Sequence, residues 1–163
     1  MSLPSSLQTV RRALQGYAAR GSFTSFSEVS TRGARAEFHF RWFRDVKFRV
    51  VFDAARRTLT FLDVLPGVPA RSDMDRDLRR FIRGRSAPSV VSHRRFDGRR
   101  VRVTCTNRGG SISLVFYLTP RHVELGVRKA VNLVHEIMMD FLNDGRFVQY
   151  QVDHFRLDPE VAS

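Results

Sequence analysis

One long amphipathic helix over residues 120–144 constrains the fold of this chain more than any other feature. At 1.5 Å per residue it would extend about 37 Å, which is enough to cross a whole sheet. Thr119 and Pro120 predict its start, because threonine caps helices and proline suits the first helical position. Gly145 predicts its end. The main apolar stripe consists of Val123, Val127, Val131, Val134, Met138, Phe141 and Leu142.

Further apolar residues of this helix, Leu125, Leu133 and Met139, lie off the stripe. A single sheet cannot cover a helix that is apolar on more than one face, so a second surface must pack against it. That surface is either the first helix of the same subunit or a second copy of the chain. Because large exposed apolar patches are uncommon on monomers, we predict a symmetric homodimer with these three residues as interface candidates.

Two stretches have an apolar period of two, which is typical of strands with one buried face. Residues 34–65 predict a meander of three antiparallel strands separated by short turns. Residues 99–118 predict a hairpin, with its loop at residues 107–110. The alternation places arginine, lysine and glutamate on one face of these strands and phenylalanine, valine and leucine on the other.

The remaining segments have weaker patterns. Ser72 and Gly84 bound a short helix in which acidic residues come first and basic residues last, as the helix dipole favours. A Ser/Thr-rich stretch over residues 22–31 interrupts the pattern after the first helix, and residues 89–96 are a candidate strand. The apolar stripe of that first helix consists of Leu3, Leu7, Val10, Leu14 and Tyr17.

Together these elements predict a single α+β domain over residues 1–145, with the helices on one face of an antiparallel sheet. The predicted order is a helix, three strands, a helix, two or three strands and the long helix. Residues 146–163 form a C-terminal extension whose weak alternation predicts an added edge strand. A chain of 163 residues can bury a full core without disulfides.

Two stretches give the chain a resemblance to a known family. Ser-Ile-Ser-Leu-Val-Phe-Tyr-Leu-Thr-Pro at 111–120 and Val-Asn-Leu-Val-His-Glu-Ile-Met-Met-Asp-Phe-Leu at 131–142 resemble the YbjN family. The order of elements over residues 5–145 is similar to the fold of class I type III secretion chaperones. The resemblance implies a small α+β protein, usually a homodimer, that holds other proteins and has no known enzymatic activity. Those chaperones are usually acidic and this chain is basic, so the client does not carry over.

Charge and composition narrow the classes of partner and compartment. The chain has 28 Lys and Arg against 16 Asp and Glu, a formal net charge of +12, and its lysines are only Lys47 and Lys129. Such a balance favours acidic or phosphate-bearing partners, although the arginines are spread along the whole chain. The lone Cys105, the short apolar runs and the absence of a leader pattern predict a soluble cytoplasmic protein.

No arrangement of residues typical of an active site stands out, so we predict no enzymatic activity, no metal and no cofactor. Cys105 lies on the apolar face of its strand, as a core thiol does. His135 and Glu136 begin a zinc motif, but Met139 stands where the second histidine belongs. Cys/His spacing suited to a metal is also missing around His39, His93, His122 and His154.

One face of the predicted sheet is basic and is the candidate partner-binding surface. A protein-binding adaptor that serves another protein, such as one that works on nucleic acid, fits this surface. The alternative is direct, sequence-independent binding of nucleic acid, with an aromatic residue among the arginines stacking on bases. The sheet-face residues are Arg35, Arg41, Trp42, Lys47, Arg49 and Arg102. A second basic run consists of Arg94, Arg95, Arg99 and Arg100.

Overall fold

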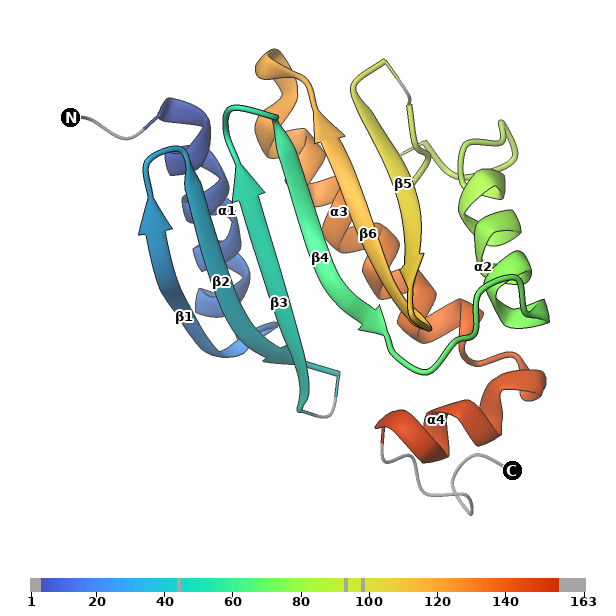
Figure 1. Cartoon of the computed structure of the whole chain (residues 1–163). Coiled ribbons are helices and arrows are strands. Elements are labelled where there is room, and N and C mark those ends of the chain that lie inside the picture. The colour runs from blue at the N-terminus through green and yellow to red at the C-terminus, as the bar shows by residue number, and fades with distance from the viewer. Residues whose placement is uncertain (1–3, 44, 93, 98, 156–163) are drawn as a thin grey trace.

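A computed structural model describes residues 4–43, 45–92, 94–97 and 99–155. Its centre is a six-stranded antiparallel sheet with the strand order β1-β2-β3-β4-β6-β5 (Figure 1). The α+β class is therefore confirmed. The strands are β1 (Thr24–Arg32), β2 (Arg35–Trp42), β3 (Val46–Asp53), β4 (Thr58–Leu65), β5 (Val101–Arg108) and β6 (Ser111–Leu118). The α-helices are α1 (Ser5–Ala19), α2 (Asp73–Gly84), α3 (Val123–Glu136) and α4 (Val148–Phe155).

The meander has one strand more than the sequence pattern predicts. The predicted strands within residues 34–65 are β2, β3 and β4, and the Ser/Thr-rich stretch expected to interrupt the pattern forms the edge strand β1. Its alternation is hidden because the pairing with β2 shifts register twice, between Thr24 and Ser27 and between Glu28 and Ser30. Phe26 still joins this strand to the core, since its ring stacks near those of β2 phenylalanines.

Helices α1 and α3 cover the same face of the sheet, as predicted, and Figure 1 shows both behind the strands. Leu7, Val10 and Leu14 of α1 are fully buried there. The glycine at position 126 lets α3 approach β6 closely, because a Cβ atom there would lie 2.4 Å from Leu118 Cδ2. Helix α2 lies beyond the β5 edge and α4 beyond the ends of the strands, so these two do not share the covering layer.

The long helix is broken into three conformations. A 3₁₀ turn over Pro120–His122 leads into α3, and a π-helical segment over Ile137–Phe141 follows it. The subunit covers the helix on more sides than the sheet alone could. Helix α1 packs along one side, and the described residues of the segment 85–100 contact another side through the Lys129–Ser92 hydrogen bond and the Arg85–Glu136 ion pair. Leu133 is buried with 1% exposure, so its predicted availability to a second copy is wrong.

The predicted strand at residues 89–96 is also wrong. Turns and irregular backbone occupy the described residues of this stretch. Several of its bonds are local: Val90 N donates to Ala87 O at 3.0 Å, and Arg95 Nη2 donates to Pro88 O and Val90 O at 2.9 Å. The carbonyls of Pro88 and Val90 bind the Arg95 guanidinium. They therefore do not form the regularly spaced bonds of a β ladder.

The predicted edge strand in the C-terminal extension is replaced by a helix. A 3₁₀ turn over Gly145–Phe147 leads into α4, and Asp144 caps the turn by accepting a bond from Arg146 N at 3.1 Å. Phe147 stacks on Phe141 at 4.7 Å, and Tyr150 Oη donates to Pro66 O at 2.6 Å. Packing therefore continues past the predicted domain boundary at residue 145. Residues 156–163 lie outside the described part of the chain.

We expect Gly126→Ala to lower the free energy of unfolding by up to about 2 kcal/mol. Overpacking against Leu118 typically costs ~1–3 kcal/mol, and alanine returns up to about 1 kcal/mol of helix propensity. Gly84→Ala in α2 is the matched control, since no atom lies within 4 Å of a Cβ there. Chemical denaturation measures both variants. Equal stability of the two would contradict the close approach of α3 to β6.

Candidate interaction surface

The face of the sheet opposite α1 and α3 is the surface that the sequence pattern nominates for binding. None of the described helices covers it, and Figure 1 looks onto it. Residues paired across antiparallel strands share a face, so the register defines the rows of this surface. One row is Arg32, Arg35, Asp53, Thr58, Tyr117 and Arg102. The next row is Ser30, Glu37, Val51, Thr60, Val115 and Thr104.

An uncharged band crosses the middle of this open face. In the register, Leu62 pairs with Arg49, and Thr58 pairs with Tyr117. Because paired residues share a face, the uncharged Leu62, Thr58 and Tyr117 lie on the same open face as Arg49. Val51, which lies between Glu37 and Thr60 in the register, is 6% exposed although none of the described helices covers it. The chain as a whole is 27% charged, so an uncharged stretch over three adjacent strands is a local departure from its composition. The band consists of Val51, Thr58, Thr60, Leu62, Val115 and Tyr117.

The five basic residues predicted for the sheet face all lie on the open side, four of them on β2 and β3 and one on β5. They form a basic margin on two sides of the uncharged band, with Glu37 and Asp53 in the same rows. Several have partners in the same subunit. Arg49 Nε lies 3.7 Å from Glu37 Oε2, and Arg49 Nη1 lies 3.7 Å from Asp63 Oδ2. Arg102 Cζ lies 4.4 Å from the centre of the Tyr117 ring. The basic margin consists of Arg35, Arg41, Lys47, Arg49 and Arg102.

Trp42 lies on the opposite face from the arginines with which it was grouped. Its ring centre is 5.0 Å from that of Phe23 and 5.5 Å from that of Phe48, both of which are buried under the helices. The reason is the period of two: Phe38, Phe40 and Trp42 point one way from β2, and the intervening charged residues point the other. Trp42 therefore belongs to an aromatic cluster on the helix side, and its inclusion in the sheet-face site is wrong.

The three candidate dimer residues do not form one surface. Leu133 is buried in the subunit, Leu125 is half-buried beside the segment 92–101, and Met139 is 44% exposed. Leu125 and Met139 are about 21 Å apart along the helix axis at 1.5 Å per residue. Both could meet a second copy only if it ran along the helix, and the segment 85–100 and α1 already pack there. The homodimer stays a prediction, and these three residues do not form one surface through which it could assemble.

The second basic run lies on the helix side and contacts α3. Arg94 Nε lies 3.9 Å from Glu136 Oε1, and Arg100 Nε lies 3.6 Å from Asp97 Oδ2. Arg99 is exposed, and its backbone N–H donates to Asp97 Oδ1 at 3.0 Å. These arginines are therefore separate from the basic margin of the open face.

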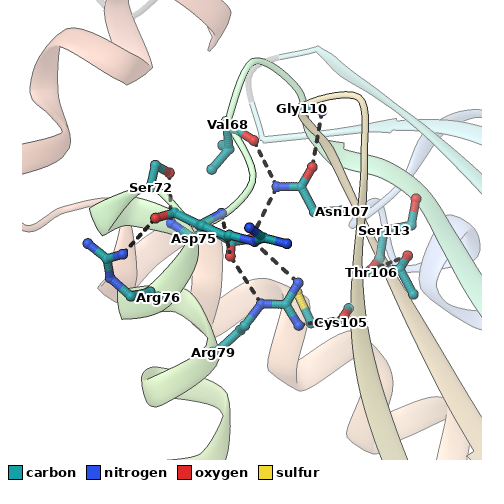
Figure 2. A network of polar contacts seen from close by, with 11 residues as sticks. Val68, Ser72, Asp75, Arg76, Arg79, Cys105, Thr106, Asn107, Gly110 and Ser113 are labelled. Atoms are coloured by element: carbon teal, nitrogen blue, oxygen red, sulfur yellow. Dashed lines mark hydrogen bonds and ion pairs between the residues drawn. The ribbon is translucent and has the colours of Figure 1, made fainter.

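A buried polar network holds α2 against the β5–β6 hairpin and so fixes one end of the open face (Figure 2). Asn107 Nδ2 donates to Val68 O at 2.8 Å and to Asp75 Oδ1 at 3.1 Å. Arg79 Nε donates to Asp75 Oδ2 at 3.2 Å, and Arg79 Nη1 donates to Cys105 O at 2.8 Å. Asp75 is 5% exposed. A carboxylate this deeply buried requires these partners, because an unpaired buried charge is strongly destabilising.

The same network sets the protonation of its members. Burial alone would raise the pKa of Asp75, but the hydrogen bonds from Asn107 and Arg79 outweigh it and hold the pKa below its ordinary value of 3.8. Burial raises the pKa of the Cys105 thiol, which keeps it protonated and unreactive at neutral pH. Cys105 is a half-buried thiol packed against the core, as the strand pattern predicts.

Among the residues that the structure describes, no group of three His, Cys, Asp or Glu side chains is arranged to hold a metal ion. None of the helices in the described part of the chain has the length and hydropathy needed to cross a bilayer.

Comparisons with family models, with curated proteins and with solved structures each found no match. The resemblance to the YbjN family and to secretion chaperones therefore stays a prediction, and the chemistry of the open face is the remaining guide to function.

We expect Asp75→Asn to lower the free energy of unfolding by about 2 kcal/mol at pH 7, since hydrogen bonds to a charged group contribute ~1.5–3 kcal/mol. Because the folded pKa of Asp75 is lowered, its contribution is full above pH 3.8 and is lost as the pH falls through that folded pKa. The difference in the free energy of unfolding between wild type and variant should therefore become smaller in acid. Urea unfolding at several pH values measures it.

Asp73→Asn on the same helix is the control, because this side chain is 92% exposed and exposed ion pairs contribute little. A gap for Asp75→Asn that does not change with pH would show that the network stabilises through shape alone.

Proposed function

We propose that this protein is a non-enzymatic, chaperone-like adaptor that holds another protein against the open face of its sheet. The observation that supports this best is the uncharged band, with hydroxyl and apolar side chains at its centre and the basic margin on two sides of it. The cores of protein interfaces are depleted in charged residues and their rims are polar. The open face has this organisation, and no described element of the same subunit covers it.

The basic margin defines the chemistry of the partner. Arg35, Lys47 and Arg102 are exposed beside the band, so a partner with acidic residues around an uncharged centre would be complementary to it. Charges at a rim increase the rate of association more than they increase affinity. Adding salt should therefore slow binding without abolishing it, because contacts of the uncharged band do not depend on ionic strength.

Direct binding of nucleic acid through the same face has less support. Base stacking needs exposed aromatic rings, but Trp42 packs on the helix side and Arg102 covers the Tyr117 ring. Arg49 lies between two carboxylates, Glu37 and Asp63, which reduce its attraction for phosphate. A filter-binding titration at two salt concentrations decides between the hypotheses, since phosphate contacts make affinity fall steeply with salt.

A photo-crosslinking amino acid at position 60 tests the adaptor proposal in the native cell. Thr60 lies in the uncharged band, and Gln15, exposed on α1, is the matched control position. We expect partner proteins to be captured from position 60 and not from position 15. Adding Val115→Lys, which places a charge in the band, should reduce capture at least fivefold, whereas Gln15→Lys should leave it unchanged.

Two outcomes would overturn the proposal. Equal capture from positions 60 and 15 would show that the open face is not a specific surface. Capture of a second copy of the chain at position 60, in place of another protein, would make the band the homodimer interface. Light scattering on wild type and Val115→Lys distinguishes that case, because the dimer would then dissociate in the variant.

A further inference from the structure

A pocket of about 350 Å³ lies on the helix side, between α3 and the segment 92–101. Three cationic side chains line it: Arg95, Arg100 and Lys129. Leu125 and Val101 supply apolar wall. The pocket lies on the other side of the sheet from the uncharged band, so ligand binding in it is independent of the proposed adaptor function.

Among the described residues that line this pocket, cationic side chains outnumber acidic ones. Asp97 is the acid in that part of the lining, and it faces Arg100, whose Nε lies 3.6 Å from Asp97 Oδ2. Burial lowers the pKa of Lys129, and the nearby Arg128, Arg100 and Arg95 lower it further, while Glu136 acts weakly in the other direction. Cations that disfavour one another's charge are stabilised together by a bound anion.

Two of the three cations, Lys129 and Arg95, are held in place by hydrogen bonds within the subunit. Lys129 is only 8% exposed, and its Nζ donates to Ser92 O at 3.1 Å. Arg95 is anchored through Nε, which donates to Val90 O at 3.1 Å, and through Nη2, which donates to two backbone carbonyls at 2.9 Å. Fixed donors lose little entropy on binding, which is the basis of preorganised recognition.

We propose that this pocket binds a small organic phosphate. Arginine and lysine together suit a phosphate dianion, since the planar guanidinium matches its oxygens and the ammonium adds a point charge. The volume is at the lower end of the range for small-molecule sites, which limits the ligand to a compact body beside the phosphate. Leu125 and Val101 provide the apolar wall for that body.

Isothermal titration of the full chain tests the proposal, with ribose 5-phosphate and inorganic phosphate as probes at constant ionic strength. We expect saturable binding of both, tighter for ribose 5-phosphate because its body contacts the apolar wall. Arg100→Gln should weaken both at least tenfold; this side chain is 55% exposed, so the variant should fold. Arg12→Gln, an exposed arginine on α1 outside the pocket, is the control with the same loss of charge.

Leu125→Phe changes the shape of the pocket without changing its charge. The larger ring should fill the apolar wall, weakening ribose 5-phosphate while leaving inorganic phosphate within twofold of wild type. The proposal is overturned if neither probe saturates, or if Arg12→Gln weakens binding as much as Arg100→Gln. Tight binding of a single-stranded oligonucleotide that Arg100→Gln abolishes, with neither small probe bound, would also overturn it and assign these cations to a polynucleotide.

Discussion

The packing of α3 against three surfaces at once is the constraint on which the rest of the structure depends. The sheet covers its main stripe, α1 covers a second side, and the segment 85–100 contacts a third. Gly126 allows the helix to lie close to β6. Helix α3 and its neighbour α1 pack against the same face of the sheet, so the described helices bury that face only. The open face is then a consequence of the fold: an antiparallel sheet with all its large helices on one side presents the other to solvent or to a partner.

The sheet's two faces differ in chemistry because the strands alternate. Phe38 and Phe40 of β2 are buried under the helices, whereas Glu37 and His39, which alternate with them, lie on the open side, where His39 Nε2 is 2.6 Å from Glu37 Oε2. Strands β4 and β6 alternate equally well but place hydroxyl and apolar groups outside. The charge of the open face is therefore concentrated at β2, β3 and β5, and it is partly balanced by acids. A net charge of +12 over the chain does not describe this surface.

Sequence patterns predicted the elements whose periodicity is strong and local, and missed those fixed by tertiary contacts. The strands β2 to β6 and the helices α1 and α2 follow from alternation, stripes and caps, such as Ser72 accepting from Asp75 N. Strand β1 was missed because its bulges disrupt the alternation. The sequence pattern predicts a strand where helix α4 forms. Phe147 and Tyr150 are spaced as on a helix, but two residues are too few to indicate an apolar stripe. The Asp75 network and the Lys129 pocket could not be found, because each joins segments separated by tens of residues.

The contact between α3 and the segment 85–100 covers part of the helix within the subunit. Arg85 Nη2 lies 2.5 Å from Glu136 Oε2, and Glu136 is 5% exposed. Burial nevertheless raises the pKa of Glu136, in spite of Arg85 and Arg94. Burial opposes the ionised form of Glu136, whereas Arg85 and Arg94 favour it, so the pair forms against a desolvation cost. Phe96 of the same segment is buried, with its ring centre 6.1 Å from that of Phe116 on β6, so apolar packing against the sheet also fixes the segment that carries the pocket's cations.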